Sequence, residues 1–231
     1  MHCMKIKNVL VVRFRQLGDA VLTTVILNTI RKNFPEARID YILNDNLAPL
    51  FEGHPSIDRI ITFSKEERAN TAAYLKKIWR IVHDTHYDVI IDKRSTLNTA
   101  PFALFSLSTP IRVALKKNYT WPFYNYRVGS VGNQNMIDHM LAHLKPLERV
   151  QSLRYERNIT LYVSEQEKND FRDYLQQQGL SFQLPIILMG VTAKLENKTW
   201  PIDRMTEVIR RFINRFPNTQ IIFNYAPGKE E

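Results

Sequence analysis

The 231-residue chain is poor in cysteine and in long apolar runs, and both scarcities narrow the class of protein. Its single cysteine, Cys3, cannot form an internal disulfide, so the sequence favours a reducing cytosol. No apolar run approaches the roughly 18 residues that a membrane span requires. The N-terminus runs straight into a predicted strand, without the apolar stretch of a signal peptide. We therefore expect a cytoplasmic protein that is neither secreted nor membrane-spanning.

Glycine is also scarce, with seven residues of which only Gly129 and Gly132 are closely spaced. A G-x-G-x-x-G dinucleotide fingerprint and a Walker P-loop are therefore both absent. Any phosphate group held by this chain must be bound by helix N-termini and side chains rather than by a glycine-rich cradle.

Basic residues outnumber acidic ones, 32 to 23, which gives a formal net charge of +9. This excess favours an anionic partner such as nucleic acid, a phosphorylated sugar or an acidic membrane surface. The charge does not choose among these partners, and a solvated basic surface without any partner is an equal alternative.

One pattern of apolar run, polar loop, amphipathic segment and second apolar run occurs twice, in residues 9–43 and 186–225. Short strands separated by one helix-length segment are typical of βαβ units in a parallel sheet. We predict an α/β protein with a Rossmann-like domain over residues 1–178 and a second over 179–231, joined by a linker at 180–185. The second stretch is too short for a parallel sheet covered on both faces. Its pieces either complete the first sheet or belong to a second domain of which the chain holds only the first part; we favour the latter.

The remaining elements follow from apolar spacing. Strands are expected at 9–14, 39–43, 59–63, 89–92, 111–115, 159–163, 186–189 and 221–225. Helices are expected at 19–33, 66–85, 97–107, 135–150, from Ser164 onward and at 201–216. Ser164 and Glu167 form a predicted capping box. Residues 116–134 are interpreted as a long loop.

The loop after the first strand reads Arg15-Gln16-Leu17-Gly18-Asp19. Gly18 suits a tight turn, and Asp19 stands at the head of the following helix. One interpretation of Asp19 is a helix N-cap, a role worth roughly 1 kcal/mol. The other is a general base, a carboxylate at the carboxyl end of a parallel strand that takes a proton from a substrate hydroxyl.

The loop after the strand at 186–189 runs from Thr192 to Pro201 and contains Lys198 just before a helix. A cation beside exposed helix N–H groups is suited to a diphosphate. An ordinary solvated lysine is the alternative.

Three stretches resemble glycosyltransferase family 9, the ADP-heptose:lipopolysaccharide heptosyltransferases. Residues 11–24, VVRFRQLGDAVLTT, resemble the opening motif of that family. Lys198-Thr199-Trp200-Pro201 resembles its Lys-x-Trp-Pro motif, and Gly190-Val191-Thr192-Ala193 resembles the stretch before it. Asp92-Lys93-Arg94 falls where the family has an Asp-containing strand end facing the cleft.

The resemblance implies a GT-B fold and metal-independent, inverting transfer of a heptose from ADP-heptose to the lipopolysaccharide inner core, without a cofactor. It makes Asp19 the general base, and Thr192 and Lys198 the residues that hold the donor phosphates. The acceptor-side candidates that it implies are Arg15, Gln16, Gly18, Asp92 and Arg94. The expected partners are a nucleotide-sugar donor, a lipopolysaccharide core acceptor and the anionic inner face of the inner membrane.

The family's later Asp-x-Gly-x-x-His segment, which contacts the nucleotide sugar, does not occur in residues 1–231. We therefore expect a C-terminally truncated member that does not turn over by itself. The alternative is a non-catalytic module that binds a sugar nucleotide or glycolipid. A nucleic-acid-binding protein is a third hypothesis, motivated by charge alone.

Two weaker signals have competing interpretations. His139 and His143 stand four residues apart on a predicted helix, a spacing able to bind zinc, but no third ligand is evident and we predict no metal site. The basic and aromatic stretch 116–127 suits packing against the domain, stacking with nucleic-acid bases, or contact with an acidic glycolipid or membrane.

Overall fold

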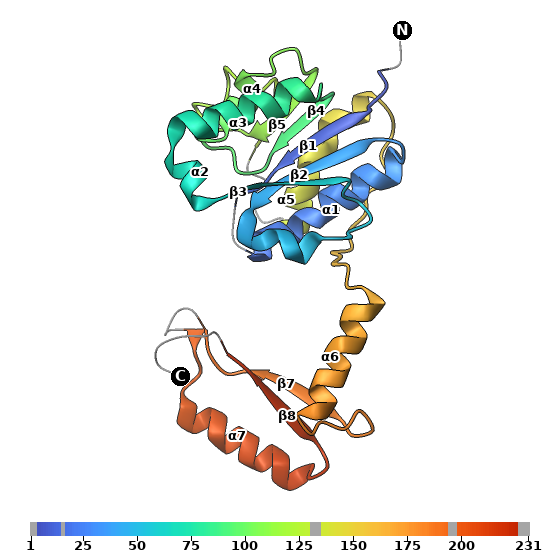
Figure 1. Ribbon diagram of the computed structural model, residues 1–231, viewed down its shortest axis with the longest axis vertical. Coiled ribbons are helices and arrows are strands. Elements are labelled where there is room, and N and C mark those ends of the chain that lie inside the picture. Colours follow the sequence, from blue (N-terminus) through green and yellow to red (C-terminus); the bar gives the residue numbers. More distant parts are fainter. Residues whose placement is uncertain (1–3, 15–16, 130–134, 194–197, 226–231) are drawn as a thin grey trace. The chain divides into compact units, whose positions relative to one another are not determined.

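The computed structural model describes residues 4–14, 17–129, 135–193 and 198–225. The chain divides into two compact units, Met1–Val163 and Ser164–Glu231 (Figure 1). The division precedes the predicted boundary at 178/179 because helix α6, Glu165–Gln177, groups with the second unit. Among the described residues, no helix combines the length and apolarity needed to cross a bilayer.

The first unit is built on a six-stranded parallel sheet with the strand order β3-β2-β1-β4-β5-β6. Its strands are β1 Asn8–Val12, β2 Arg38–Asn44, β3 Arg59–Phe63, β4 Val89–Asp92, β5 Ile111–Leu115 and β6 Tyr126–Val128. The central strands are apolar on both faces, as expected where helices cover both sides of a sheet. In β1, residues Val9 to Val12 have no exposed surface at all.

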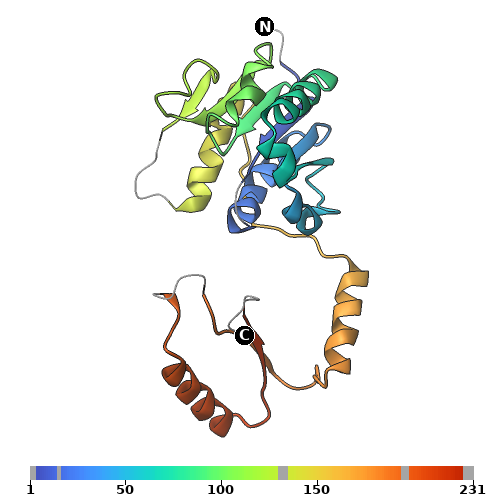
Figure 2. The same ribbon diagram turned by 60° about the vertical axis from the view of Figure 1, so that its left-hand side comes forward.

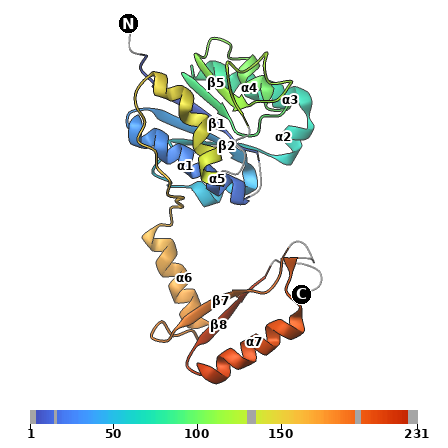
Figure 3. The ribbon, with the colours of Figure 1, turned by 180° about the vertical axis from the view of Figure 1, so that it is seen from behind.

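Helices cover the two faces of this sheet (Figures 1 and 3). On one face, α1 Leu17–Asn33, α5 Met136–Leu141 and the 3-10 helix η2 Ala142–Arg149 pack in a single buried cluster with alternate residues of the strands. On the other, α3 Thr71–Asp84 and α4 Ala100–Leu104 pack against Leu10, Val12 and Ile90. A second 3-10 helix, η1 Asp45–Phe51, follows β2.

Three local predictions differ from the structure. The predicted helix 66–85 is divided into α2, Lys65–Ala69, and α3, because Asn70 leaves helical geometry and caps α3 with its side chain. The predicted helix 97–107 is restricted to α4. The predicted loop 116–134 contains strand β6, which pairs with β5 over Tyr126–Val128.

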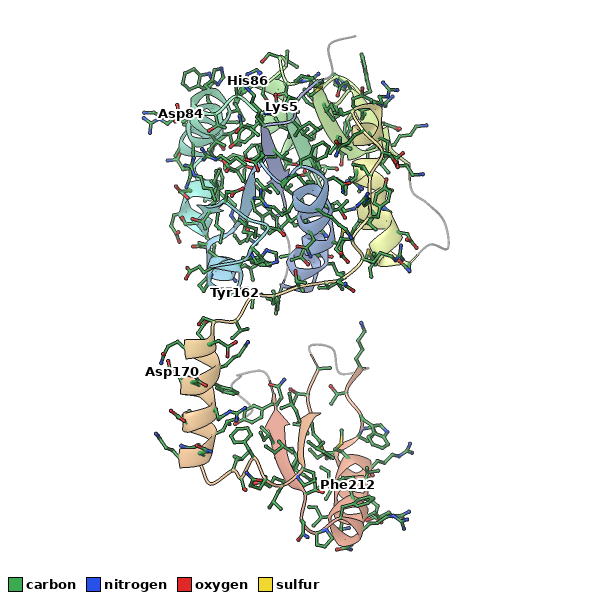
Figure 4. All side chains as sticks on the ribbon, turned by 90° about the vertical axis from the view of Figure 1, so that its right-hand side faces the viewer. Lys5, Asp84, His86, Tyr162, Asp170 and Phe212 are labelled. Carbon is green, nitrogen blue, oxygen red and sulfur yellow. The ribbon has the colours of Figure 1, made fainter. Side chains whose placement is uncertain are left out.

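The predicted strand at 159–163 is wrong. Among the described residues no strand pairs with this segment, which instead runs along helix α1 and bonds to side chains of that helix. Thr160 N–H donates to Thr24 Oγ1 at 3.2 Å, and Asn28 Nδ2 donates to the Asn158 carbonyl at 3.1 Å. Figure 4 shows Tyr162, close to the end of this segment, at the end of the first unit opposite to Lys5 and His86.

The second unit contains α6, β7 Ile186–Gly190, α7 Ile202–Arg215 and β8 Gln220–Asn224. β7 and β8 are parallel and lie between α6 and α7 (Figure 2). The predicted capping box of α6 is confirmed, since Ser164 and Glu167 bond to each other's backbone. The structure confirms the predicted fold class. It is α/β and GT-B-like, with one Rossmann-like sheet and part of a second.

Candidate functional site

The carboxyl edge of the parallel sheet brings together the predicted residues of the first unit. β1 and β4 are neighbours, and their connections leave in opposite directions along the sheet. In open α/β sheets, ligands bind outside the carboxyl ends of the strands at such a switch point. Asp19 follows β1, and Asp92 is the last residue of β4.

Asp19 lies in the first turn of α1, two residues after the helix begins at Leu17. The N-cap interpretation of Asp19 is therefore wrong. Its carboxylate instead forms an ion pair with Arg13 of 2.9 Å from Oδ1 to Nη2. The Arg13 side chain is 7% exposed and that of Asp19 is 28% exposed, so a buried cation holds a carboxylate that solvent still reaches.

Arg13 is itself held in place by the neighbouring strand end. Its Nη1 donates to the carbonyl of Lys93 at 2.7 Å, which ties the loop after β1 to the loop after β4. Lys93 is buried and donates from Nζ to Nδ1 of His139 at 3.2 Å. Burial, together with the charges of Lys93 and Arg13, lowers the pKa of His139. A neutral imidazole is what this contact needs, because only then can Nδ1 accept.

Asp92 is completely buried and organises the loop that follows β4. Its Oδ1 accepts from the backbone N–H groups of Arg94 and Ser95 at 2.9 and 2.8 Å. Its Oδ2 accepts from Thr99 Oγ1 and from Tyr124 O–H, both at 2.6 Å. Burial raises the pKa of Asp92, while these four donors oppose that shift. The contacts indicate that Asp92 positions the loop; its predicted contact with the acceptor is untested.

Ser95 takes a left-handed backbone conformation in this loop, with φ of 51°. Such a conformation is costly for a residue other than glycine and persists only where surrounding contacts hold it. Here the Ser95 hydroxyl donates to the Asp92 carbonyl at 2.7 Å, and the Ser95 carbonyl accepts from Lys117 Nζ and Tyr119 O–H. No sequence signal pointed to Ser95.

Two hollows open at this edge and share Phe14 and Arg94. The first has a volume of about 580 Å³ and is lined by Phe14, Leu17, Asp19, Asn44, Asn46, Leu47 and Arg94. The second, of about 470 Å³, lies between the α2–α3 corner and the loop after β4. Its polar lining includes Arg68, Thr71, Arg94, Thr96 and Asn98. Carboxylate, amide and guanidinium groups therefore face a space large enough for sugar rings.

Gly18 is not a turn glycine. It lies inside α1, and a Cβ added there would meet nothing within 4 Å. The side chain it lacks leaves room beside Asp19. The predicted acceptor-side residues Arg15 and Gln16 lie outside the described residues.

In the second unit, Thr192 and Lys198 lie on the loop that joins β7 to α7, and both are exposed. Ala193 N–H donates to Thr199 Oγ1 at 3.3 Å, so the two ends of this loop approach each other next to the helix. Pro201 is the N-cap of α7 rather than its first helical residue. The loop thus places a hydroxyl and a cation between the carboxyl end of a strand and the amino end of a helix.

Sequence reasoning did not assign roles to Arg13, Arg68 and Lys93. Arg13 and Lys93 were part of quoted motifs, but their contacts depend on the adjacency of β1 and β4. Arg68 lies in the predicted helix 66–85, to which no functional role was assigned.

Fold and site together define an α/β protein with polar side chains gathered at the carboxyl edge of a parallel sheet. A sequence model described as glycosyltransferase family 9 (heptosyltransferase) matches residues 75–231. Since this match covers more than half of the sequence, the chain belongs to glycosyltransferase family 9.

Individual relatives agree with this assignment. Lipopolysaccharide heptosyltransferase 3 of Escherichia coli K12 is 22% identical over 226 residues, which are 94% of this chain and 62% of the relative. A solved family 9 glycosyltransferase of Veillonella parvula superposes with a TM-score of 0.81 at 20% identity, over 95% of this chain and 63% of that one. The chain thus spans less than two thirds of these two relatives.

A third relative was solved with a donor analogue. The E. coli heptosyltransferase WaaC with ADP-2-deoxy-2-fluoro heptose superposes with a TM-score of 0.60 at 14% identity. The likeness covers 93% of this chain and 76% of that one.

Proposed function

We propose that the protein is a glycosyltransferase that moves a heptose from ADP-heptose to a sugar of the lipopolysaccharide inner core, with inversion at the anomeric carbon. One observation carries the proposal: in a family 9 chain, a carboxylate fixed by a buried arginine faces a hollow at the switch point of the sheet. The ADP-heptose analogue bound by a solved relative supports this choice of donor.

In this proposal Asp19 is the general base. The acceptor hydroxyl attacks the anomeric carbon from the face opposite the diphosphate, and Asp19 takes its proton as the new C–O bond forms. The bond between the anomeric carbon and the diphosphate oxygen breaks, and its electron pair leaves with ADP. A single displacement of this kind inverts the anomeric centre. Arg13 keeps the carboxylate oriented for the proton transfer.

Thr192 and Lys198 are proposed to bind the donor diphosphate. The Thr192 hydroxyl and the Lys198 ammonium donate hydrogen bonds to phosphate oxygens, and the amino end of α7 contributes further positive potential. These groups stabilise the negative charge that develops on departing ADP, the task that a divalent metal performs in other enzymes. No metal ion is required in this scheme.

The second hollow is proposed to take acidic or phosphorylated sugars of the acceptor. Arg68 and Arg94 supply charge, and Thr71, Thr96 and Asn98 supply hydrogen-bonding groups of the kind that bind sugars. The acceptor is a glycolipid, so we place the protein at the cytoplasmic face of the inner membrane, in peripheral contact with anionic lipid.

The test is mass spectrometry of a deacylated inner-core acceptor incubated with ADP-heptose and the protein, both as the 231-residue chain and with any downstream sequence restored. A gain of one heptose that is lost in Asp19→Asn supports the proposal; a gain that persists in Asp19→Asn removes Asp19 from the mechanism. ADP binding, measured by calorimetry, should weaken at least tenfold in Lys198→Ala and remain unchanged in Asp19→Asn.

The alternative is a module that binds a sugar nucleotide or glycolipid without catalysis. ADP binding without any mass gain, with the downstream sequence restored as well as without it, would support that alternative and contradict the enzyme.

A further inference from the structure

Residues 93–137 contain no aspartate or glutamate, the longest stretch of this kind in the chain. Between 93 and 129 the same stretch carries six cations: Lys93, Arg94, Arg112, Lys116, Lys117 and Arg127. The next-longest stretches without an acidic residue, 174–195 and 208–229, are less than half as long. The stretch leads from the carboxyl end of β4 through α4 and β5 to β6 and therefore occupies one side of the first unit.

Large apolar side chains are exposed within this acid-free stretch. Leu97, Leu104, Leu107 and Trp121 are 62%, 43%, 57% and 67% exposed. Contacts keep their segments adjacent. Arg112 donates from Nε to the Phe123 carbonyl at 2.9 Å and from Nη1 to the Leu107 carbonyl at 2.7 Å, which joins the turn after α4 to the loop that contains Trp121.

Two cations lie on the same side. Ala114 of β5 packs with Ala103 of α4, and its partner across the ladder is Arg127. Because successive side chains of a strand point to opposite faces, Arg127 lies on the α4 face, whereas Tyr126 and Val128 pack in the cluster of the α1 face. Lys116 stands two residues after Ala114 and continues the pairing, since its N–H donates to the Val128 carbonyl at 2.7 Å, so alternation places it on the α4 face as well. Both Lys116 and Arg127 are exposed.

We propose that Leu97, Leu104, Leu107 and Trp121, with Lys116 and Arg127, form a surface that docks on an anionic phospholipid bilayer. Exposed leucine and tryptophan side chains suit the interfacial region of a bilayer, and the exposed cations of a stretch that contains no acidic residue are attracted to anionic headgroups. Below, these six residues are called the docking surface.

The position of Leu97 connects this surface to the acceptor. Leu97 lines the second hollow beside Arg94 and also belongs to the exposed apolar set. A glycolipid whose acyl chains stay in the bilayer would therefore find the hollow at the edge of the docked surface. In this respect the docking surface rests on the proposed function, because a glycolipid acceptor explains why such a surface adjoins the second hollow.

The test is sedimentation of the whole chain with vesicles of phosphatidylethanolamine and phosphatidylglycerol, and with vesicles of phosphatidylcholine alone. We expect binding to the anionic vesicles only, decreasing as salt rises. Trp121→Ser should weaken the partition coefficient by roughly tenfold, and Lys116→Ala by about fivefold.

Matched controls separate docking from general hydrophobicity and charge. Leu104 and Leu161 are both 43% exposed, but Leu161 lies on the segment that crosses α1, on the opposite face of the sheet. Leu104→Ser should weaken vesicle binding and Leu161→Ser should not. Lys32→Ala, an exposed lysine in the last turn of α1 on the opposite face, is the control for Lys116→Ala. Equal losses in variant and control would overturn the assignment.

A spectroscopic measurement tests the same surface without relying on affinity. The protein contains three tryptophans, so Trp79→Phe with Trp200→Phe leaves Trp121 alone. Brominated anionic lipid should quench Trp121 fluorescence, and absence of quenching in bound protein would overturn the surface.

Vesicle binding needs neither donor nor turnover, so the two proposals fail separately. Vesicle binding that depends on Trp121, without heptose transfer even when any downstream sequence is restored, supports the surface and contradicts the proposed enzyme. Heptose transfer without vesicle binding contradicts the surface and leaves the enzyme in place.

Discussion

The two units of this chain differ most in what they bury. The first unit packs apolar side chains against both faces of its sheet, in one cluster under α1, α5 and η2 and another under α3 and α4. In the second unit no described residue is buried, and Leu188 of β7 and Phe223 of β8 are largely exposed. The βα order is the same, so local pattern alone does not create a core. A parallel strand becomes buried only when both faces of its sheet are covered.

The polar groups of the two units differ in the same way. In the first unit Asp92, Lys93 and Arg13 are buried and held by hydrogen bonds across strands. In the second, Glu207 forms its ion pairs with Arg210 and Arg211 on the surface of one helix. Exposed pairs of that kind contribute little to stability, whereas a buried group with fixed partners is costly to disturb.

The largest difference in stability between the two units is expected when the chain is cut between them and each fragment is unfolded separately. Residues 1–163 should unfold cooperatively in urea, because their core is complete within the fragment. Residues 164–231 should show no cooperative transition, because no described residue there is buried. Circular dichroism during urea titration measures both, and a cooperative transition in 164–231 would show that the second unit is stable without a buried core.

A smaller difference, in the free energy of unfolding, is expected when one carboxylate is removed from each unit in turn. Asp92→Ala leaves two backbone N–H groups and two hydroxyls without their acceptor and should lower the free energy of unfolding by about 3 kcal/mol. Asp203→Ala, in the exposed first turn of α7, should change it by less than about 0.5 kcal/mol. Urea denaturation of the whole chain compares the two variants, and similar losses would contradict the comparison.

The smallest effect is a dependence on pH that only the first unit should show. All six histidines lie in residues 1–163, and burial lowers the pKa of His143 well below its ordinary value. Below about pH 6.5 the unfolded chain binds a proton at His143 that the folded chain does not, so stability is complete above that pH and decreases as pH falls. Between pH 7.5 and 5.5 the titration of His143 should lower the free energy of unfolding of the first unit by about 1.4 kcal/mol.

Urea denaturation of residues 1–163 at the two pH values measures this cost, and His143→Phe should reduce the difference. The variant removes the hydrogen bond from His143 to the His139 carbonyl at both pH values alike, so the difference between them isolates the titration. An unchanged difference would show that another group titrates.

The predictions from sequence succeeded where a segment's own residues decide its structure. Apolar runs located seven of the eight described strands, and the side chains of Ser164 and Glu167 capped α6 as expected. β6 was missed because its three residues, Tyr126-Arg127-Val128, are too few to show a strand pattern and are ordered by pairing with β5. The segment 159–163 was mistaken for a strand because its residues have a strand-like apolar pattern, but the Thr160 N–H bonds to a side chain of helix α1 instead of to a strand.

The sequence by itself determined the α/β class, the family and the loops that carry Asp19, Thr192 and Lys198, because motifs and apolar periodicity are local properties. Tertiary structure decided what surrounds those loops. It pairs Asp19 with Arg13, ties Arg13 to the carbonyl of Lys93, and closes four donors around Asp92. These contacts join residues up to 80 positions apart along the chain, because β1 lies beside β4 in the sheet. Adjacency of that kind is set by strand order and burial, which no single segment of the sequence encodes.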